Sequence, residues 1–387
     1  MYLDAEDENV LAGEFGETRQ KMMEILVALG RVYDAEKLVP IASAQVSGAS
    51  YKTIGKWGLH WLSTMNARVA VPAVLNPIGM PRDEWRELDG ITPEFAHQQE
   101  EVLAAYRRLG IKLECTCTPY YLQRTEYGEH LAWSESSAVC YANSVIGART
   151  NREGGPSALA AAIVGKTPFY GLHIVENRRP GVVVEVEAGD APHADHYGAI
   201  GYLAGREVGN RIPIFTGIRP GRDQLKALGA AMAASGAVAL FHVDKITPET
   251  RVFHFETESL ERITVGQQDI EDLFAALDVD AVAIGCPHCS PDELREVANL
   301  LRDKQTTKPL LVFVARAVAR ENPDLVGAIE RSGAKVVPDT CMVVSPAMDR
   351  YRAIMVDSGK AFAYVPGMCG ALARIGTRKE CIDVATS

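Results

Sequence analysis

VDAVAIGCPHCSPDELREVANLLRD, at residues 279–303, is the stretch of sequence that decides the fold. Its opening VDAVAIGC is a short apolar run that ends at turn residues, which is typical of a buried strand. Ser290, Pro291 and Glu293 then supply an N-cap, a first-turn proline and a capping-box acid, so a helix should follow. The same order repeats in PLLVFVAR (309–316), NPDLVGAIERSG (322–333) and AKVVPDTC (334–341). This alternation predicts βαβ units around a parallel sheet.

The earlier part of the chain shows the same alternation. We expect a helix over about residues 14–33, then a buried strand, LVPIASAQV, at 38–46, and a helix at 50–65. The strand ARVAVPAVL follows, and Pro72 demotes it to a sheet edge or ends it early. Later segments continue the pattern with a helix at 92–110 and with the strands IKLECTC (111–117), 181–187, IPIFTG (212–217) and AVALFHV (237–243).

Length and composition place the chain among multidomain globular proteins. Its 387 residues exceed what one ordinary core holds, so we expect an α/β protein of several small βαβ domains at residues 1–150, 151–265 and 266–387. No apolar run approaches the roughly 20 residues that span a bilayer, and the acidic start MYLDAEDENV predicts a cytoplasmic location. The formal charge of −10 disfavours nucleic acid or an anionic membrane as the main partner.

Three cysteines, Cys117, Cys286 and Cys341, are each expected at the carboxyl end of a strand. Sites in parallel α/β sheets form beyond these strand ends, so three thiols there could hold a metal or an iron–sulfur cluster with one corner open. A single free cysteine is more often a small buried hydrophobe, but three at equivalent positions favour a shared role. Structural zinc prefers two close pairs, and the chain has one such pair, Cys286 with Cys289. That CPHC pair leaves dithiol redox chemistry as the second interpretation.

Six ordered motifs resemble the aconitase X family across essentially the whole chain. They are QVSGASYKTIG (45–55), VLNP (74–77), CTCTPYY (115–121), AWSESSAVCYANSVIGARTNREGGPSAL (132–159), GCPHCS (285–290) and PDTCMVV (338–344). The resemblance implies an aconitase-like catalytic core of α/β domains packed around a [4Fe–4S] cluster, which can be isolated as [3Fe–4S] or [2Fe–2S]. It assigns the cluster to Cys117, Cys286 and Cys341, with Cys115 and Cys289 close enough in sequence to replace a ligand.

The activity that the resemblance implies is loss of water from a hydroxy acid. An open iron would polarise the hydroxyl, and a base would remove the proton next to the carboxylate. The family's substrate-contacting positions fall on Gly48, Ala49, Ser50, Asn76, Pro77, Ser136, Ser137 and Lys360. The chain is most similar to the large subunits that convert (R)-mevalonate 5-phosphate to trans-anhydromevalonate 5-phosphate in the archaeal mevalonate (isoprenoid) pathway. Dehydration of cis-3-hydroxy-L-proline is the alternative within the family.

The resemblance also implies a partner chain. Members of this length work with a small swivelling-domain subunit, as a heterodimer or heterotetramer, and that subunit is expected to supply a catalytic serine base. An iron-sensing, RNA-binding role is the alternative outside catalysis, and the acidic charge counts against it. Two residues keep open interpretations: Arg152 could bind a phosphate or pair with nearby acids, and for His288 a plain turn is favoured over a supporting contact to the cluster.

Overall fold

The computed structural model describes residues 1–187 and 196–387, and its C-terminal region is a five-stranded parallel sheet. The strand order is β13 (Lys335–Pro338), β12 (Leu310–Val314), β11 (Ala281–Cys289), β14 (Ala353–Val356) and β15 (Leu372–Ile375). Every residue of β11, β12 and β14 is buried, as expected for parallel strands covered on both faces. The strands and helices expected within residues 279–341 are confirmed. Two further strands, β14 and β15, extend the sheet beyond them.

Five helices complete this region: α11 (Pro291–Leu300), α12 (Arg316–Glu321), α13 (Pro323–Arg331), α14 (Gly359–Cys369) and α15 (Arg378–Thr386). The start of α11 follows its predicted caps, because the Ser290 hydroxyl accepts the Glu293 N–H and the Glu293 carboxylate accepts the Ser290 N–H. Cys369 is the last residue of α14, and Pro366 lies inside that helix.

The N-terminal region holds a four-stranded parallel sheet in the order β4 (Lys112–Cys115), β3 (Ala73–Leu75), β2 (Ala44–Val46) and β5 (Ala132–Trp133). One apolar core joins residues of α2 (Glu17–Val32), α3 (Tyr51–Thr64), α4 (Pro93–Arg108) and α6 (Gly155–Val164) to it. The short α1 (Ala5–Leu11), which the sequence did not predict, adds Val10 to this core.

Two strand predictions in this region are wrong. LVPIASAQV is not one strand: β1 (Leu38–Pro40) pairs antiparallel with β6 (Lys166–Pro168), and only β2 enters the parallel sheet. The second correction concerns β3, which lies inside the sheet between β4 and β2 rather than at its edge. Pro72 stands just before β3, where its carbonyl accepts the Ala44 N–H at 3.0 Å and no N–H is needed.

The middle region is a third parallel sheet, in the order β10 (Arg262–Gly266), β7 (Val182–Glu187), β8 (Pro213–Thr216) and β9 (His242–Val243). It packs with α7 (Tyr197–Val208), α8 (Arg222–Ser235), α9 (Pro248–Val252) and α10 (Gln267–Leu273). Of the predicted strand AVALFHV, only the last two residues pair in the sheet, as β9.

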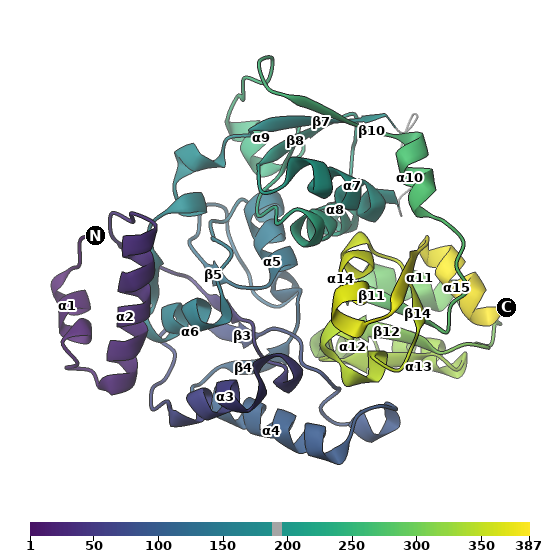
Figure 1. Ribbon diagram of the computed structural model, residues 1–387, viewed down its shortest axis with the longest axis horizontal. Coiled ribbons are helices and arrows are strands. Elements are labelled where there is room, and N and C mark those ends of the chain that lie inside the picture. The colour runs from purple at the N-terminus through teal and green to yellow at the C-terminus, as the bar shows by residue number, and fades with distance from the viewer. Residues whose placement is uncertain (188–195) are drawn as a thin grey trace.

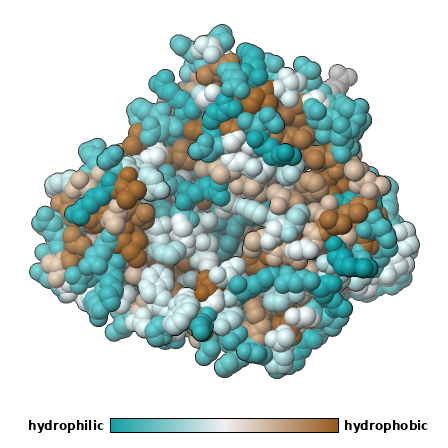
Figure 2. All heavy atoms as spheres, in the orientation of Figure 1, coloured by the Kyte–Doolittle hydropathy of each residue, from teal (hydrophilic) through white to brown (hydrophobic). Residues whose placement is uncertain are grey.

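The three regions surround a common centre, with the N-terminal region at the left and bottom of Figure 1, the middle region at the top and the C-terminal region at the right. Backbone hydrogen bonds join the first and last regions there: Ile78 N–H donates to Asp339 O at 2.9 Å, and Cys341 N–H donates to Ile78 O at 3.0 Å. The middle of the face in Figure 2, where the regions meet, is mostly pale in colour, which marks residues of intermediate hydropathy. Across the described residues, none of the helices combines the length and apolar character that a membrane crossing requires.

Candidate active site

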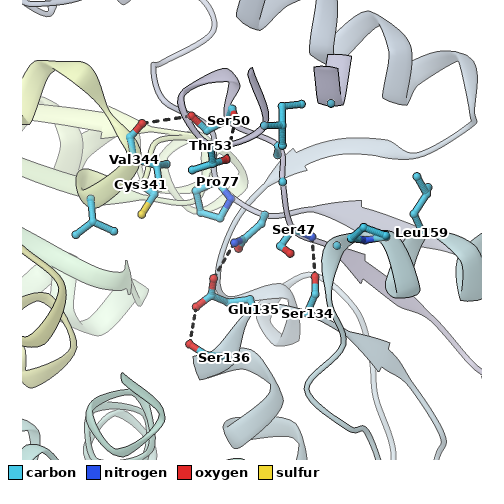
Figure 3. Close-up of a pocket in the computed structure, with 18 of the residues that line it drawn as sticks. Ser47, Ser50, Thr53, Pro77, Ser134, Glu135, Ser136, Leu159, Cys341 and Val344 are labelled. Carbon is cyan, nitrogen blue, oxygen red and sulfur yellow. Dashed lines mark hydrogen bonds between the residues drawn. The ribbon is translucent and has the colours of Figure 1, made fainter. Parts of the chain in front are cut away.

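A cavity of about 620 Å³ opens where the N-terminal and C-terminal regions meet. Loops after β2, β3 and β5 line it together with Cys341 (Figure 3), and Lys360 at the start of α14 also lines it. Seven of the eight predicted substrate-contacting residues line it: Gly48, Ala49, Ser50, Asn76, Pro77, Ser136 and Lys360. Ser137 lies directly behind the cavity wall, since its hydroxyl accepts a hydrogen bond from Lys360 Nζ at 3.1 Å.

The three predicted cluster cysteines come together beside this cavity. Cys117 follows β4 by two residues, Cys286 lies in the irregular end of β11, and Cys341 follows β13 by three residues. Lys360 and Glu135 act electrostatically on all three thiols, and Cys341 acts in turn on Cys117 and Cys286. The expected convergence at strand ends therefore holds, with the refinement that two of the thiols stand on loops just past their strands.

The two alternative cysteines face other surroundings. Cys115 is packed into the apolar core of the N-terminal region, and its charged neighbours are Asp339 and Arg82. Cys289 is packed into a core cluster of the C-terminal region, near Glu293 and Asp357. Neither thiol has Lys360 or Glu135 among these neighbours, which favours Cys117 and Cys286 as ligands.

His288 ties together the three loops that carry these cysteines. Its backbone N–H donates to Cys117 Sγ at 3.1 Å, its Nε2 contacts Thr340 O at 2.8 Å, and its Nδ1 contacts Thr116 Oγ1 at 3.1 Å. A carbonyl can only accept, so Nε2 carries the proton and Nδ1 accepts from the threonine hydroxyl. Burial lowers the His288 pKa to about 4, so the ring is neutral. The favoured interpretation of His288 as a plain turn residue is therefore incomplete, because the residue also connects the loops that carry the three cysteines.

Three free thiols are a donor set that suits an iron–sulfur cluster with one open iron. Among residues 1–187 and 196–387, no three His, Cys, Asp or Glu side chains are close enough together to ligate one metal ion. A cluster places each thiolate on a different iron, so its ligands stand further apart, and thiolates are the usual ligands of such clusters. All three thiols are free, and burial raises their pKa, that of Cys117 to about 12. Binding a cluster would therefore displace their protons.

Asp339 fixes the loop that carries Cys341. Its backbone is left-handed, at φ 61°, a conformation that is strained for a residue other than glycine and costs roughly 1–3 kcal/mol. The fully buried carboxylate compensates by accepting from Arg82 Nε at 3.0 Å and from Arg316 Nε at 2.8 Å. Two guanidinium groups and the Ile78 bridge thus hold this turn in place.

Glu135 is the central charged group of the cavity wall. It forms an ion pair with Lys360, and it accepts from Asn76 Nδ2 at 2.7 Å and from the Ser137 hydroxyl at 3.1 Å. Burial opposes its ionisation, but Lys360 and these hydrogen bonds outweigh burial and lower the Glu135 pKa to about 2. The ion pair likewise outweighs burial at Lys360 and raises its pKa well above the ordinary range. Both groups are charged at neutral pH.

The loop between β2 and α3 offers backbone donors to the cavity. Gly48 adopts φ 81°, which glycine tolerates, and its carbonyl accepts from the Tyr106 hydroxyl at 3.1 Å. Gln99 Nε2 donates to Ala49 O at 2.7 Å, and the Ser50 hydroxyl donates to Val344 O at 3.2 Å (Figure 3). Within the described part of the chain, the N–H groups of residues 48–50 have no acceptor. They are available to an anionic group of a ligand.

Several residues of the cavity were missed or left undecided from the sequence. The sequence analysis did not single out Glu135, although this residue lies between the end of β5 and the two predicted serines, Ser136 and Ser137. Ser47 and Ser134 also line the cavity, where the Ser134 hydroxyl accepts the Ser47 N–H at 2.6 Å. Arg152, for which two roles were open, lines the cavity, and no described carboxylate forms an ion pair with it. It is therefore free to attract an anion.

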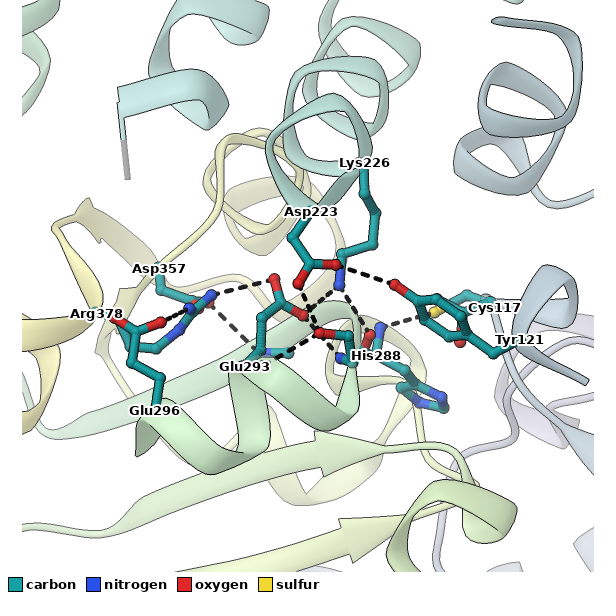
Figure 4. Close-up of polar contacts among 12 residues, drawn as sticks. Cys117, Tyr121, Asp223, Lys226, His288, Glu293, Glu296, Asp357 and Arg378 are labelled. Atoms are coloured by element: carbon teal, nitrogen blue, oxygen red, sulfur yellow. Dashed lines mark hydrogen bonds and ion pairs between the residues drawn. The ribbon is translucent and has the colours of Figure 1, made fainter. Parts of the chain in front are cut away.

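A second buried charge network lies beneath the CPHC turn (Figure 4). Lys226 of α8 forms an ion pair with Glu293 of α11 and donates to His288 O at 3.3 Å. Arg378 joins Glu293 to Asp357, and Asp223 accepts from Tyr121 at 3.2 Å and from Ser290 at 2.8 Å. The network thereby fastens the middle region to the two regions that carry the thiols.

Comparison with known proteins assigns every region of the chain to one family. Three family models, described as the first, second and third domains of aconitase X, match residues 1–176, 180–275 and 279–387. The phosphomevalonate dehydratase large subunit of Methanosarcina mazei is 54% identical over 100% of this chain and 97% of its own length. The protein of the same name from Methanothermobacter thermautotrophicus is 51% identical over 96% of this chain and 95% of its own length.

A solved structure and a more distant enzyme complete the comparison. The crystal structure of Thermococcus kodakaraensis aconitase X in its holo-form superimposes with a TM-score of 0.92 at 45% identity, covering all of both chains. The cis-3-hydroxy-L-proline dehydratase of Pseudomonas aeruginosa is 33% identical over 99% of this chain but 70% of its own length.

Proposed function

The chain belongs to the aconitase X family, and from this premise we propose that it is the large subunit of an iron–sulfur hydro-lyase that dehydrates (R)-mevalonate 5-phosphate to trans-anhydromevalonate 5-phosphate. One observation carries the proposal: predicted substrate residues and a predicted cluster thiol line one cavity, in a chain 54% identical over its whole length to a phosphomevalonate dehydratase large subunit. The cavity volume lies within the usual range for small-molecule sites, roughly 300–1,000 Å³.

Cys117, Cys286 and Cys341 would hold the cluster, with His288 fixing their loops. A cluster on three thiolates supplies a Lewis-acidic iron with one open position for a substrate hydroxyl. The chain's own residues bind and orient the substrate. Lys360 presents an ammonium to the carboxylate, the N–H groups of residues 48–50 receive anionic oxygens, and Arg152 attracts the anionic substrate into the cavity.

The proton-removing base is expected on the small subunit. Among the described residues that line the cavity, Glu135 is the carboxylate. It is a weak base because Lys360 and four further hydrogen-bond donors contact it and its pKa is lowered to about 2. The name large subunit, which the Methanosarcina and Methanothermobacter relatives carry, implies a partner chain in those proteins. We infer the same requirement here, with a serine of a small swivelling-domain subunit as the base.

Dehydration of cis-3-hydroxy-L-proline is the second candidate, and it has less support. The relative with that name is 33% identical, and the chain spans 70% of its length, against 97% of the Methanosarcina protein. Dithiol redox chemistry has the least support. Cys286 and Cys289 are both buried with raised pKa, whereas reactive dithiols are partly exposed with lowered pKa.

The proposed activity is tested by anaerobic co-expression with a small subunit, followed by assay of water loss from mevalonate 5-phosphate and from cis-3-hydroxy-L-proline. We expect turnover of the phosphorylated substrate by the complex and none by either chain alone. A complex that contains its cluster and leaves mevalonate 5-phosphate unchanged would contradict the proposal, and turnover of hydroxyproline in its place would establish the alternative.

The cluster assignment has its own test in matched serine substitutions. Cys117→Ser, Cys286→Ser and Cys341→Ser should each reduce iron content and the visible absorbance of the anaerobically purified protein. Cys115→Ser and Cys289→Ser, placed in apolar cores, should retain both. Iron loss from Cys289→Ser with full retention in Cys286→Ser would reassign the ligand.

A further inference from the structure

Glu135 controls which atoms the cavity wall presents to a ligand. It lies between β5 and α5 (Ser136–Tyr141), and its side chain accepts the Ser137 N–H at the start of that helix. From the same position it holds Asn76 of the N-terminal region and Lys360 of the C-terminal region. Three of the predicted substrate residues, namely Asn76, Ser137 and Lys360, thus depend on one carboxylate for their orientation.

The Asn76 amide can lie only one way round. An ionised carboxylate offers acceptors and no donor, so the amide NH₂ must face Glu135, at 2.7 Å. The opposite amide atom, Oδ1, is then turned away from Glu135. It is buried and has no hydrogen-bond partner in the described residues, although Asn76 lines the cavity. A buried acceptor without a donor costs about 1–3 kcal/mol, which a ligand hydroxyl would recover.

Lys360 is oriented by the same carboxylate. Its ammonium has three donors, and two of them point to Glu135 and to the Ser137 hydroxyl. One N–H remains for the cavity, and the paired charge leaves a weaker field than an unpaired lysine would give. Glu135 therefore stands between two groups, the acceptor Asn76 Oδ1 and one N–H donor of Lys360.

We propose that Glu135 is a positioning residue, which orients Asn76 to accept a hydrogen bond from the substrate hydroxyl and Lys360 to donate one to the substrate carboxylate. The inference rests on the proposed function, and it adds which side chains bind the hydroxyl and the carboxylate of the substrate. A hydroxyl that donates to Asn76 Oδ1 keeps its oxygen lone pairs free for a Lewis acid. In this way the chain selects for the hydroxyl that is to be lost.

The test compares two ligands that differ in that hydroxyl. The two-subunit complex in cluster-free form, which cannot turn over, is titrated calorimetrically with mevalonate 5-phosphate and with its 3-deoxy analogue. The wild-type complex should bind the hydroxylated ligand at least about tenfold more tightly, since one hydrogen bond to a buried acceptor is worth about 1–3 kcal/mol. Asn76→Ala and Glu135→Gln should both bring the ratio of the two dissociation constants close to one.

Controls separate positioning from damage to the fold. Glu249→Gln changes another buried, ion-paired glutamate that lies outside this cavity, and it should leave the ratio unchanged. In the cluster-containing complex, Glu135→Gln should lower kcat for mevalonate 5-phosphate about 10²-fold with a smaller change in KM. Asn76→Ala, at the cavity wall, keeps the test decisive if Glu135→Gln unfolds.

The possible failures point to different errors. A wild-type complex that binds neither ligand overturns the substrate assignment, and the positioning role with it. Equal affinity for the two ligands in wild type, or a preference that survives Glu135→Gln and Asn76→Ala, overturns the positioning role and leaves the proposed function standing.

Discussion

Two buried lysine–glutamate pairs lie near the thiols, and they differ in what surrounds them. Lys226 and Glu293 are enclosed: the carboxylate also accepts from Ser290 N–H and Arg378, and the ammonium also donates to a carbonyl. Lys360 and Glu135 stand in a cavity wall, with a spare ammonium donor and an unpartnered Asn76 oxygen beside them. We therefore propose that the enclosed Lys226–Glu293 pair stabilises the fold, and that the Lys360–Glu135 pair in the cavity wall takes part in binding a ligand.

The largest effect should come from breaking the enclosed pair. Glu293→Gln removes the charge that faces Lys226 and Arg378 while keeping the side-chain shape. Breaking a buried pair typically costs about 3–5 kcal/mol, so the free energy of unfolding in denaturant should fall by that amount. Glu135→Gln, measured in parallel, should lose less, because cavity water can solvate Lys360. Equal losses would remove the distinction between the two pairs.

Lys360→Met should affect catalysis more than folding. It deletes the ammonium proposed to receive the substrate carboxylate, and removing one such donor typically lowers kcat by about 10²–10³-fold. Steady-state assay of the two-subunit complex measures this change, and denaturant unfolding provides the stability reference. Lys226→Met is the matched variant, expected to lower stability while folded enzyme keeps most of its kcat.

Acid should remove the stabilising contribution of the Lys360–Glu135 pair within a defined range of pH. The Glu135 pKa of about 2 lies below its ordinary value of 4.5, so the folded state binds this proton less readily than the unfolded state. Its stabilising contribution is fully present above pH 4.5 and is lost as pH falls toward 2. Unfolding curves of wild type and Glu135→Gln should therefore converge across this window, and a constant difference would contradict the ion-pair assignment.

The smallest change in stability should come from the N-cap of α11, the helix that carries Glu293. Ser290→Ala removes the hydroxyl that accepts the Glu293 N–H at 3.1 Å at the start of α11. Losing such an N-cap costs about 0.5–2 kcal/mol. Thermal unfolding should show this decrease, with the iron content of the protein unchanged.

Local signals in the sequence were sufficient for residues 279–341 of the C-terminal region and for part of the site. The caps of α11 and the buried strands depend on neighbours in sequence, so Ser290, Glu293 and the parallel sheet were predictable. The position of three thiols near strand ends followed from sheet geometry alone. The residues lining the cavity came from the family resemblance, since nothing local marks Lys360 as buried.

What the sequence could not provide depends on contacts between distant segments. Glu293 was predicted as a capping acid, but its pairing with Lys226 joins two regions that no periodicity links. Glu135 escaped notice because its importance lies in its partners, Asn76 and Lys360, which come from other loops. The division of residues 38–46 between two sheets likewise depends on β6, which lies far along the chain.

The backbone bridge between Ile78 and the turn before Cys341 joins two segments that are synthesised at different times. The loops after β2, β3 and β5 leave the ribosome well before Cys341 and Lys360, which line the same cavity. A nascent chain consequently carries Cys117 long before its companions exist. A cluster held by all three proposed thiols could therefore be inserted only after Cys341 has been synthesised.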